Sequence, residues 1–326
     1  MSEDKNIKFD LLENGLDFIL SSVQLIIEKK KIQDYKYSVL HLSAGLELVL
    51  KERLKQEHWS FVFENIDKAK KELLATGDFQ SVKLDSLLNR LKELCGIDLA
   101  TGDLGVLQDL KKRRNKIEHF AFNETELSLK SLSAKVLNFA FEFIHSELDN
   151  DSFSQAIKSQ VEEIRISSLE FKEFVIHRFD SLKPKLEELK KQDFTLVVQC
   201  PYCDQESLVL DQDKIAHEGF VKCAVCIVQA DPETAAFDYV QNILGCSHYG
   251  SFKDGDEFPL RNCPECGLNA FVGANDGYIC FNCCETSSVD STNECSYCGE
   301  IYFLKADDLG FCDNCWEYKE SQWEKL

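Results

Sequence analysis

Cysteine pairs in the last third of the chain are the residues best suited to chemistry. The 326 residues include fifteen cysteines, and twelve of these form six C-x2-C pairs after residue 199. Taken two at a time, the pairs make three units, with 19 residues between the pairs of the first unit and 13 in each of the others. Four thiolates gathered in this way bind one zinc ion tetrahedrally. The expected ligands are Cys200, Cys203, Cys223, Cys226, Cys263, Cys266, Cys280, Cys283, Cys295, Cys298, Cys312 and Cys315.

The second and third units are an internal repeat, "CPECGLNAFVGANDGYICFNC" and "CSYCGEIYFLKADDLGFCDNC". In each repeat a glycine, Gly267 or Gly299, follows the first pair, where a metal-binding turn often needs a positive φ. A strand-like run and an acidic turn then lead to the second pair. These units resemble zinc ribbons over roughly residues 194–316. Because four cysteines leave no ligand position open to water, we expect three structural Zn²⁺ sites rather than catalytic ones.

Other interpretations of the cysteines stay open. A rubredoxin-like iron site uses the same ligands, and reduced structural thiols or disulfides are the alternatives without metal. Cys284 is adjacent to Cys283 and can replace it as a ligand. Cys246 and His248 form a C-x-H pair that can bind a further ion, and Cys95 is left over as well.

The charge of the chain bears on its partners. The formal net charge is -20, and 23 acidic but only 7 basic residues follow residue 195. Phosphate binding needs clustered Lys and Arg, so we expect the acidic ribbons to bind a protein partner rather than nucleic acid. The first ten residues contain acids and do not resemble an export signal, and the apolar runs are shorter than a membrane span. We therefore expect a cytoplasmic protein that does not enter a membrane.

A second set of reactive residues lies in the stretch "RRNKIEHF", which we expect to be helical. At 100° per residue, one side of this helix carries Leu107, Leu110 and Ile117. Arg114 falls on the same apolar stripe, where an arginine needs a pocket, a carboxylate or a phosphate. Asn115 and His119 are i, i+4 neighbours on the adjoining flank. The wheel leaves Arg113 on the solvent side, so three phosphate-competent groups are predicted along one edge.

The elements that must position these groups are helices, because residues 1–150 contain no proline and show repeated three- and four-residue apolar steps. The steps predict a bundle of four or five helices. "KLDSLLNRLKELCG" is one of them, with Gly96 as its C-cap, and the helix of the reactive stretch begins near Asp103. The apolar stripes of two others comprise Val39, Leu42, Leu46 and Leu50, and Leu129, Leu132, Val136, Phe139 and Phe143.

In this helical context, "RNKIEH" resembles the R-N-x3-H form of the R-x4-6-H motif of HEPN domains. HEPN domains are all-helical bundles, and many are metal-independent ribonucleases in toxin–antitoxin, antiphage and RNA-processing systems. The segment "YSVLHLSAGLELVLKERL" resembles the second helix of the family, including a polar Glu47 with Lys51 one turn later. The resemblance covers residues of about 8–148.

The resemblance implies specific roles in RNA cleavage. His119 would be a general base or acid, because an imidazole exchanges protons near neutral pH. Arg114 would stabilise the charge of the phosphorane, and Asn115 would orient the phosphate or the imidazole. Glu47 and Lys51 would support them. The family commonly builds one composite site from two motifs, so the resemblance also implies a homodimer that binds RNA at the helical domain.

Two other functions compete with the ribonuclease. One is a non-catalytic adaptor, in which the helical domain dimerises and the ribbons bind proteins. The other is a nucleotide-binding domain of the type paired with small nucleotidyltransferases. The alternative interpretation of the motif itself is that Arg114 pairs with Glu47 or Glu118 as a buried structural bridge, and that His119 is an ordinary residue at a helix end.

The whole chain is therefore expected to be multidomain. A helical bundle occupies residues 1–150, a helical linker 151–193, a first zinc ribbon 194–240 and two tandem ribbons 241–326. The linker either packs on the bundle or forms a dimerising stalk, with a break or kink at Pro184. "FTLVVQ" is predicted to be the strand that opens the first ribbon.

Overall fold

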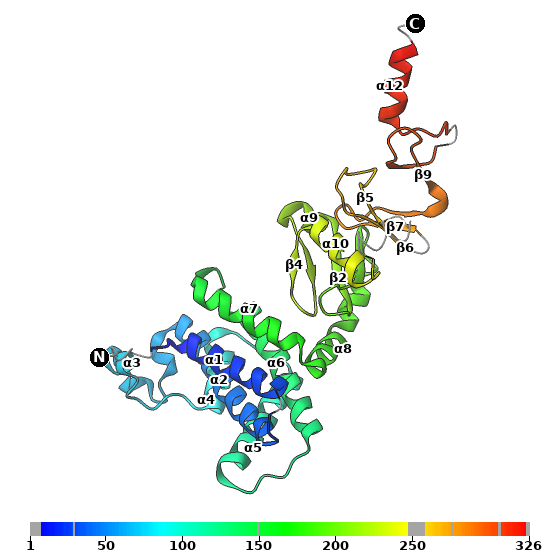
Figure 1. The fold of residues 1–326 in the computed structure, drawn as a ribbon. Coiled ribbons are helices and arrows are strands. Elements are labelled where there is room, and N and C mark those ends of the chain that lie inside the picture. The colour runs from blue at the N-terminus through cyan, green and yellow to red at the C-terminus, as the bar shows by residue number, and fades with distance from the viewer. Residues whose placement is uncertain are drawn as a thin grey trace, which may run out of the picture. The chain divides into compact units, whose positions relative to one another are not determined.

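The chain divides into a helical unit, Met1–Arg178, and a cysteine-rich unit, Phe179–Leu326. The computed structural model describes residues 8–323 except 29, 149, 247–257, 275–276 and 306–307. The boundary between the units lies within the segment that the sequence assigns to a linker. Figure 1 follows the chain from the helices to the small sheets, which is the predicted order of helical and β-rich parts.

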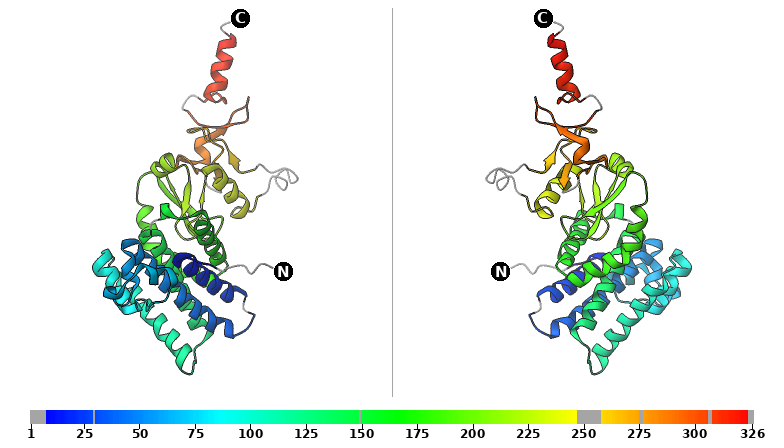
Figure 2. Two further views of the ribbon diagram at one scale, coloured as in Figure 1. Left: turned by 90° about the vertical axis from the view of Figure 1, so that its left-hand side faces the viewer. Right: turned by 90° about the vertical axis from the view of Figure 1, so that its right-hand side faces the viewer.

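The first two helices, α1 (Leu11–Glu28) and α2 (Gln33–Glu57), form a tightly packed hairpin. Figure 2 shows this hairpin in blue from two further sides. The helices meet at two glycines, since a Cβ atom at Gly45 would lie only 2.6 Å from the carbonyl oxygen of Gly15. Close approach of the two backbones therefore depends on the lack of side chains at these positions.

Three further long helices complete the predicted bundle. They are α4 (Leu84–Cys95), α5 (Thr101–His119) and α6 (Glu126–Glu147). Gly96 caps α4 in the left-handed conformation, with φ 72°, as predicted. The predicted stripes of α2 and α6 are buried along their whole length. Short helices connect the long ones: η1 (Trp59–Val62), η2 (Ile66–Lys68), α3 (Lys71–Thr76) and η3 (Asn150–Ser152).

The segment after the bundle forms α7 (Gln155–Leu169) and α8 (Lys172–Leu189). α7 packs along α1, and the Phe174 ring at the start of α8 lies 5.5 Å from the Phe141 ring of α6. These contacts are those of a segment that packs on the bundle, one of the two predicted arrangements. Of the break or kink expected at Pro184, the break does not occur, because α8 continues through this residue to Leu189.

The cysteine-rich unit is built from short antiparallel strands, and the prediction of a strand at "FTLVVQ" is confirmed by β1. The first sheet has the order β1 (Thr195–Gln199), β2 (Glu206–Asp211), β3 (Val221–Cys223) and β4 (Gln229–Ala230), with α9 (Gln212–Glu218) and α10 (Pro232–Asn242) beside it. The second has the order β5 (Leu260–Arg261), β6 (Phe271–Ala274), β7 (Gly277–Cys280) and β8 (Thr286–Ser288). The last part comprises η4 (Val289–Ser291), the β9–β10 hairpin (Thr292–Glu294 and Ile301–Phe303) and α12 (Asp313–Trp323).

Among the residues that the structure describes, none of the helices is both long and apolar enough to cross a membrane.

Candidate metal centres and a candidate phosphate cleft

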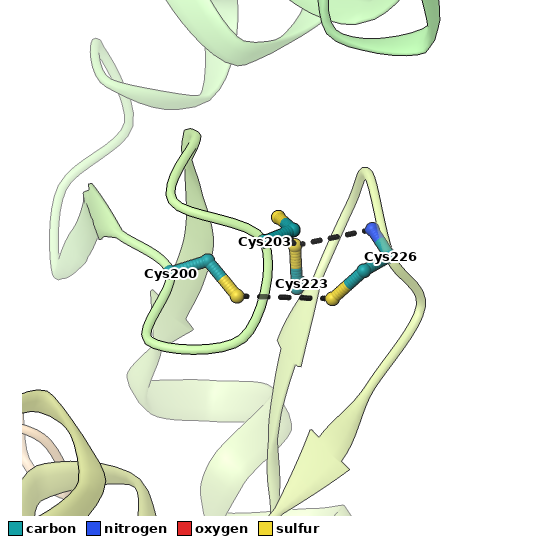
Figure 3. A group of neighbouring side chains, drawn as sticks. All are labelled: Cys200, Cys203, Cys223 and Cys226. Carbon is teal, nitrogen blue, oxygen red and sulfur yellow. Dashed lines mark hydrogen bonds between the residues drawn. The ribbon is translucent and has the colours of Figure 1, made fainter. Parts of the chain in front are cut away.

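The twelve predicted cysteines gather into three groups of four. Cluster 1 contains Cys200, Cys203, Cys223 and Cys226, cluster 2 contains Cys263, Cys266, Cys280 and Cys283, and cluster 3 contains Cys295, Cys298, Cys312 and Cys315. Within each cluster all four Sγ atoms lie within 4.8 Å of one another. Figure 3 shows cluster 1, where one pair comes from the turn between β1 and β2 and the other from the end of β3.

The sulfur–sulfur distances fit a tetrahedral ion. Cys200 and Cys226 are 3.7 Å apart at Sγ, as are Cys203 and Cys223. Zn–S bonds of about 2.3 Å place two ligands of a tetrahedron about 3.8 Å apart. A disulfide would need a sulfur–sulfur separation of about 2.05 Å, so neither Cys200 and Cys226 nor Cys203 and Cys223 are joined by one. Clusters 2 and 3 repeat the 3.7 Å separation.

Hydrogen bonds to sulfur favour the thiolate form that a metal requires. The backbone N–H of Cys226 donates to Sγ of Cys223 over 3.3 Å, and the Ser207 hydroxyl lies 3.1 Å from the same sulfur. In cluster 2, a hydrogen bond with the Cys280 thiol lowers the pKa of Cys263 to about 5. A thiolate that already accepts hydrogen bonds loses less stabilisation when it leaves water to bind an ion.

A left-handed residue follows the second cysteine in five of the six pairs. Gly267 and Gly299 have φ of 76° and 75°, as predicted. Asp204, Ile227 and Cys284 adopt the same conformation, which the sequence did not indicate. In the sixth pair, α12 begins at Asp313 and contains Cys315, so the two repeats differ at their ends.

This turn also decides between the neighbouring cysteines. Cys283 belongs to cluster 2, whereas Cys284 occupies the left-handed position after it and lies outside the cluster. Burial raises the pKa of Cys284 to about 12, so its thiol is protonated and unreactive. The proposed Cys246–His248 pair cannot be described, because His248 lies outside the described residues.

A cleft of about 220 Å³ lies between α2 and α5 in the helical unit. It brings together residues from separate parts of the chain, including three of the five predicted catalytic or supporting side chains. Its lining consists of Leu40, Ser43, Ala44, Glu47, Leu48, Lys51, Arg114 and Glu118. Glu47, Lys51 and Arg114 therefore line one cleft.

On the α2 side of the cleft, Lys51 is held by two partners. Its ammonium donates to Oε1 of Glu47 over 2.6 Å and to Oγ of Ser81 over 2.9 Å. The Lys51 side chain is only 7% exposed, whereas Glu47 is 36% exposed. Lys51 is thus a nearly buried cation, and Glu47 is its counter-ion.

On the α5 side, Arg114 is less buried than the helical wheel suggested. Leu107, Leu110 and Ile117 are buried as predicted, but the Arg114 side chain is 44% exposed. Its Nε lies 3.0 Å from Oε2 of Glu118, one of the two predicted partners, and its Nη1 donates to Oδ1 of Asn115 over 3.3 Å. His119 ends α5, is 64% exposed and lies 3.7 Å from Glu118. Asn115 and His119 therefore flank the cleft rather than line it.

The prediction that Arg113 faces solvent is wrong. Its side chain is only 16% exposed, because the start of α6 and the loop before it cover it. Arg113 pairs with Asp109 and with Glu124, 3.7 Å away, and it donates to Ser128 over 3.1 Å. The i, i+4 spacing of Asp109 and Arg113 was a signal in the sequence that could have indicated this structural role.

Comparisons with protein-family models, with curated proteins and with solved structures found no match for this chain. The resemblance to HEPN domains therefore stays a prediction.

Proposed function

We propose that the chain is a metal-independent RNA endonuclease of the HEPN type that cleaves RNA at the α2–α5 cleft. The observation that carries this proposal is the grouping of Glu47 and Lys51, from α2, with Arg114, from α5. These positions were selected by a motif and by a resemblance, not by proximity. Two cations that line the cleft, with an amide and an imidazole beside it, are groups that can support phosphoryl transfer without a metal.

In the proposed reaction, the imidazole of His119 takes the proton of a ribose 2′-hydroxyl. The 2′-oxygen attacks the adjacent phosphorus, and the bond from phosphorus to the 5′-oxygen breaks. Arg114 stabilises the negative charge of the phosphorane, while Asn115 orients the phosphate or the imidazole. The leaving 5′-oxygen takes a proton from the imidazolium of a second copy of the chain, which makes the active enzyme a homodimer. The products are a 2′,3′-cyclic phosphate and a 5′-hydroxyl.

The three cysteine clusters each hold one Zn²⁺ in this proposal, and the zinc is structural. Their strands have two to six residues, too few for a substantial apolar core, so metal binding supplies most of their folding free energy. The cytoplasm, where thiols stay reduced, suits such sites. The acidic modules around them recruit a protein partner, in antiphage defence, a toxin–antitoxin pair or RNA processing.

The test is cleavage of tRNA and mRNA by the full-length protein, with excess EDTA added at assay time. Wild type should cleave, while His119→Ala and Arg114→Ala should not. Lys112→Ala, which removes an exposed cation of the same helix, is the matched control and should cleave like wild type. Equal silence or equal cleavage by all four proteins would contradict the nuclease. Circular dichroism must show that each protein remains folded.

A non-catalytic adaptor is the second candidate, and the exposed aromatic residues beside cluster 3 favour it. Tyr297 and Tyr318 are 59% and 52% exposed, and their rings lie 6.1 Å apart. Paired exposed aromatics are typical of protein-binding surfaces. The same assay separates the two functions, because an adaptor leaves RNA intact in every variant.

A further inference from the structure

One oxygen atom of Glu118 faces both of the groups that would act on a phosphate. Its Oε2 lies 3.0 Å from Nε of Arg114 and 3.7 Å from Nε2 of His119. We infer that the Glu118 carboxylate occupies the anion position of the cleft, and that an RNA phosphate must displace it. This inference rests on the proposed function and names a residue that opposes RNA binding at the same site.

The charges of the cleft explain why displacement is needed. Lys51 and Arg114 are its two cations, and Glu47 and Glu118 are its two carboxylates. Each cation is paired with one carboxylate, at 2.6 Å and 3.0 Å. While both pairs are intact, the cleft carries no excess positive charge to attract a phosphate. Binding therefore requires that one of the carboxylates leave its partner.

The exposed fractions show which pair opens. Lys51 is only 7% exposed, so loss of Glu47 would leave an ammonium buried without its counter-ion, which is strongly unfavourable. Arg114 and Glu118 are 44% and 32% exposed, and an ion pair in contact with water contributes little. A phosphate also offers the guanidinium two parallel hydrogen bonds in place of the single contact with Glu118. Glu118 is thus the carboxylate that the phosphate replaces.

The direct test measures binding without cleavage. The probe is a short fluorescent single-stranded RNA with every 2′-hydroxyl methylated, which cannot be cut by the proposed reaction, and the readout is fluorescence anisotropy with the full-length protein. Glu118→Gln keeps the shape of the side chain and removes its charge. It should tighten binding about fivefold, or about 1 kcal/mol at about 1.4 kcal/mol per tenfold.

Asp109→Asn is the matched control. It removes the same charge from the same helix, but Asp109 pairs with Arg113 and lies outside the cleft lining, and Arg113 keeps Glu124 as a partner. Its affinity for the probe should equal that of wild type. An equal gain from both variants would mean that only net charge matters, and would overturn the inference.

A double variant tests whether Glu118 acts through Arg114. In an Arg114→Ala background, the change of Glu118 to Gln should give no gain, because the cation that it frees is absent. A gain that persists in that background, no gain in the single variant, or no binding by any variant overturns the inference. If Glu118→Gln tightens binding of the probe but no variant cuts RNA, the anion site is supported and the proposed nuclease activity is contradicted. If wild type cuts RNA but Glu118→Gln binds the probe no more tightly, the nuclease is supported and the role of Glu118 is contradicted.

Discussion

Gly45→Ala is the substitution that tests the packing of the helical unit most directly. A Cβ atom at Gly45 would lie 2.6 Å from the carbonyl oxygen of Gly15 and 2.8 Å from Cγ1 of Ile19. The carbonyl belongs to the backbone of α1 and cannot rotate away. The methyl group must therefore push α1 and α2 apart, and α2 forms one wall of the candidate cleft.

Two effects of opposite sign set the magnitude. Alanine in place of glycine inside a helix gains about 1 kcal/mol. Overpacking of a well-packed contact costs about 1–3 kcal/mol, and a backbone obstacle places this case at the upper end. The expected net loss in the free energy of unfolding is about 2 kcal/mol. With a urea dependence of about 2 kcal/mol per M, the unfolding midpoint falls by about 1 M.

The assay is urea unfolding of the full-length protein followed by the helical circular dichroism signal. Gly105→Ala is the matched control, because Gly105 lies inside α5 and a Cβ atom there meets nothing within 4 Å. It should show only the helical gain and unfold at a higher urea concentration than wild type. If Gly45→Ala unfolds at the same concentration as Gly105→Ala, the tight contact between α1 and α2 does not limit stability, and the reasoning fails.

Three further predictions concern metal, pH and backbone strain. Metal analysis should give three Zn²⁺ per chain. Prolonged chelation should unfold the small sheets but leave the helical circular dichroism signal largely intact. If the sheets and the helices unfold together, the two units do not have separate sources of stability. Burial raises the pKa of Glu52 above its ordinary 4.5, so the folded state binds protons more tightly than the unfolded state and stability falls as the pH rises through that raised value. In urea unfolding at a series of pH values, Glu52→Gln should therefore gain stability relative to wild type as the pH rises above about 4.5, and a constant difference would contradict this. Ile227 is a β-branched residue with φ 61°, a strained conformation that glycine adopts freely. Ile227→Gly should therefore stabilise the sheet that carries cluster 1 by about 1 kcal/mol, measured as stronger retention of metal against a competing chelator. Weaker retention would contradict the assigned strain.

The four-cysteine clusters were predicted residue by residue, because the spacing that brings their ligands together is local in the sequence. A C-x2-C turn positions two thiolates by itself, and a hairpin returns the next pair. The left-handed conformation of Asp204, Ile227 and Cys284 was missed, because glycine is the strongest sequence signal for it, aspartate is a weaker one, and isoleucine and cysteine rarely adopt it. The choice of Cys283 over Cys284 followed from the same backbone detail.

The cleft was predicted less completely, because its lining residues come from helices that are far apart in the sequence. A helical wheel gives the direction of a side chain but not the element that covers it. Arg113 and Arg114 are neighbours, yet Glu124 and Ser128 cover Arg113, while Arg114 opens on the cleft. The positions of α2 and α6 beside α5 determine which of the two side chains is covered. Within α5, the spacing of Asp109 and Arg113 indicates a partner for Arg113 but not the residues that cover it.

The two units of the chain differ in what stabilises them. Removing the metal therefore offers a way to find which unit carries the reaction. Apolar stripes and the Gly15–Gly45 contact stabilise the helical unit, whereas each four-cysteine cluster has the spacing to hold a metal ion and has little apolar core of its own. The groups proposed for cleavage all belong to α2 and α5, and none of them is a metal ligand. Cleavage that persists after the modules have lost their metal would therefore place the whole reaction in the helical unit. Cleavage that stops while the helical signal is unchanged would mean that the metal-bound modules are needed for RNA recruitment or for assembly of the dimer.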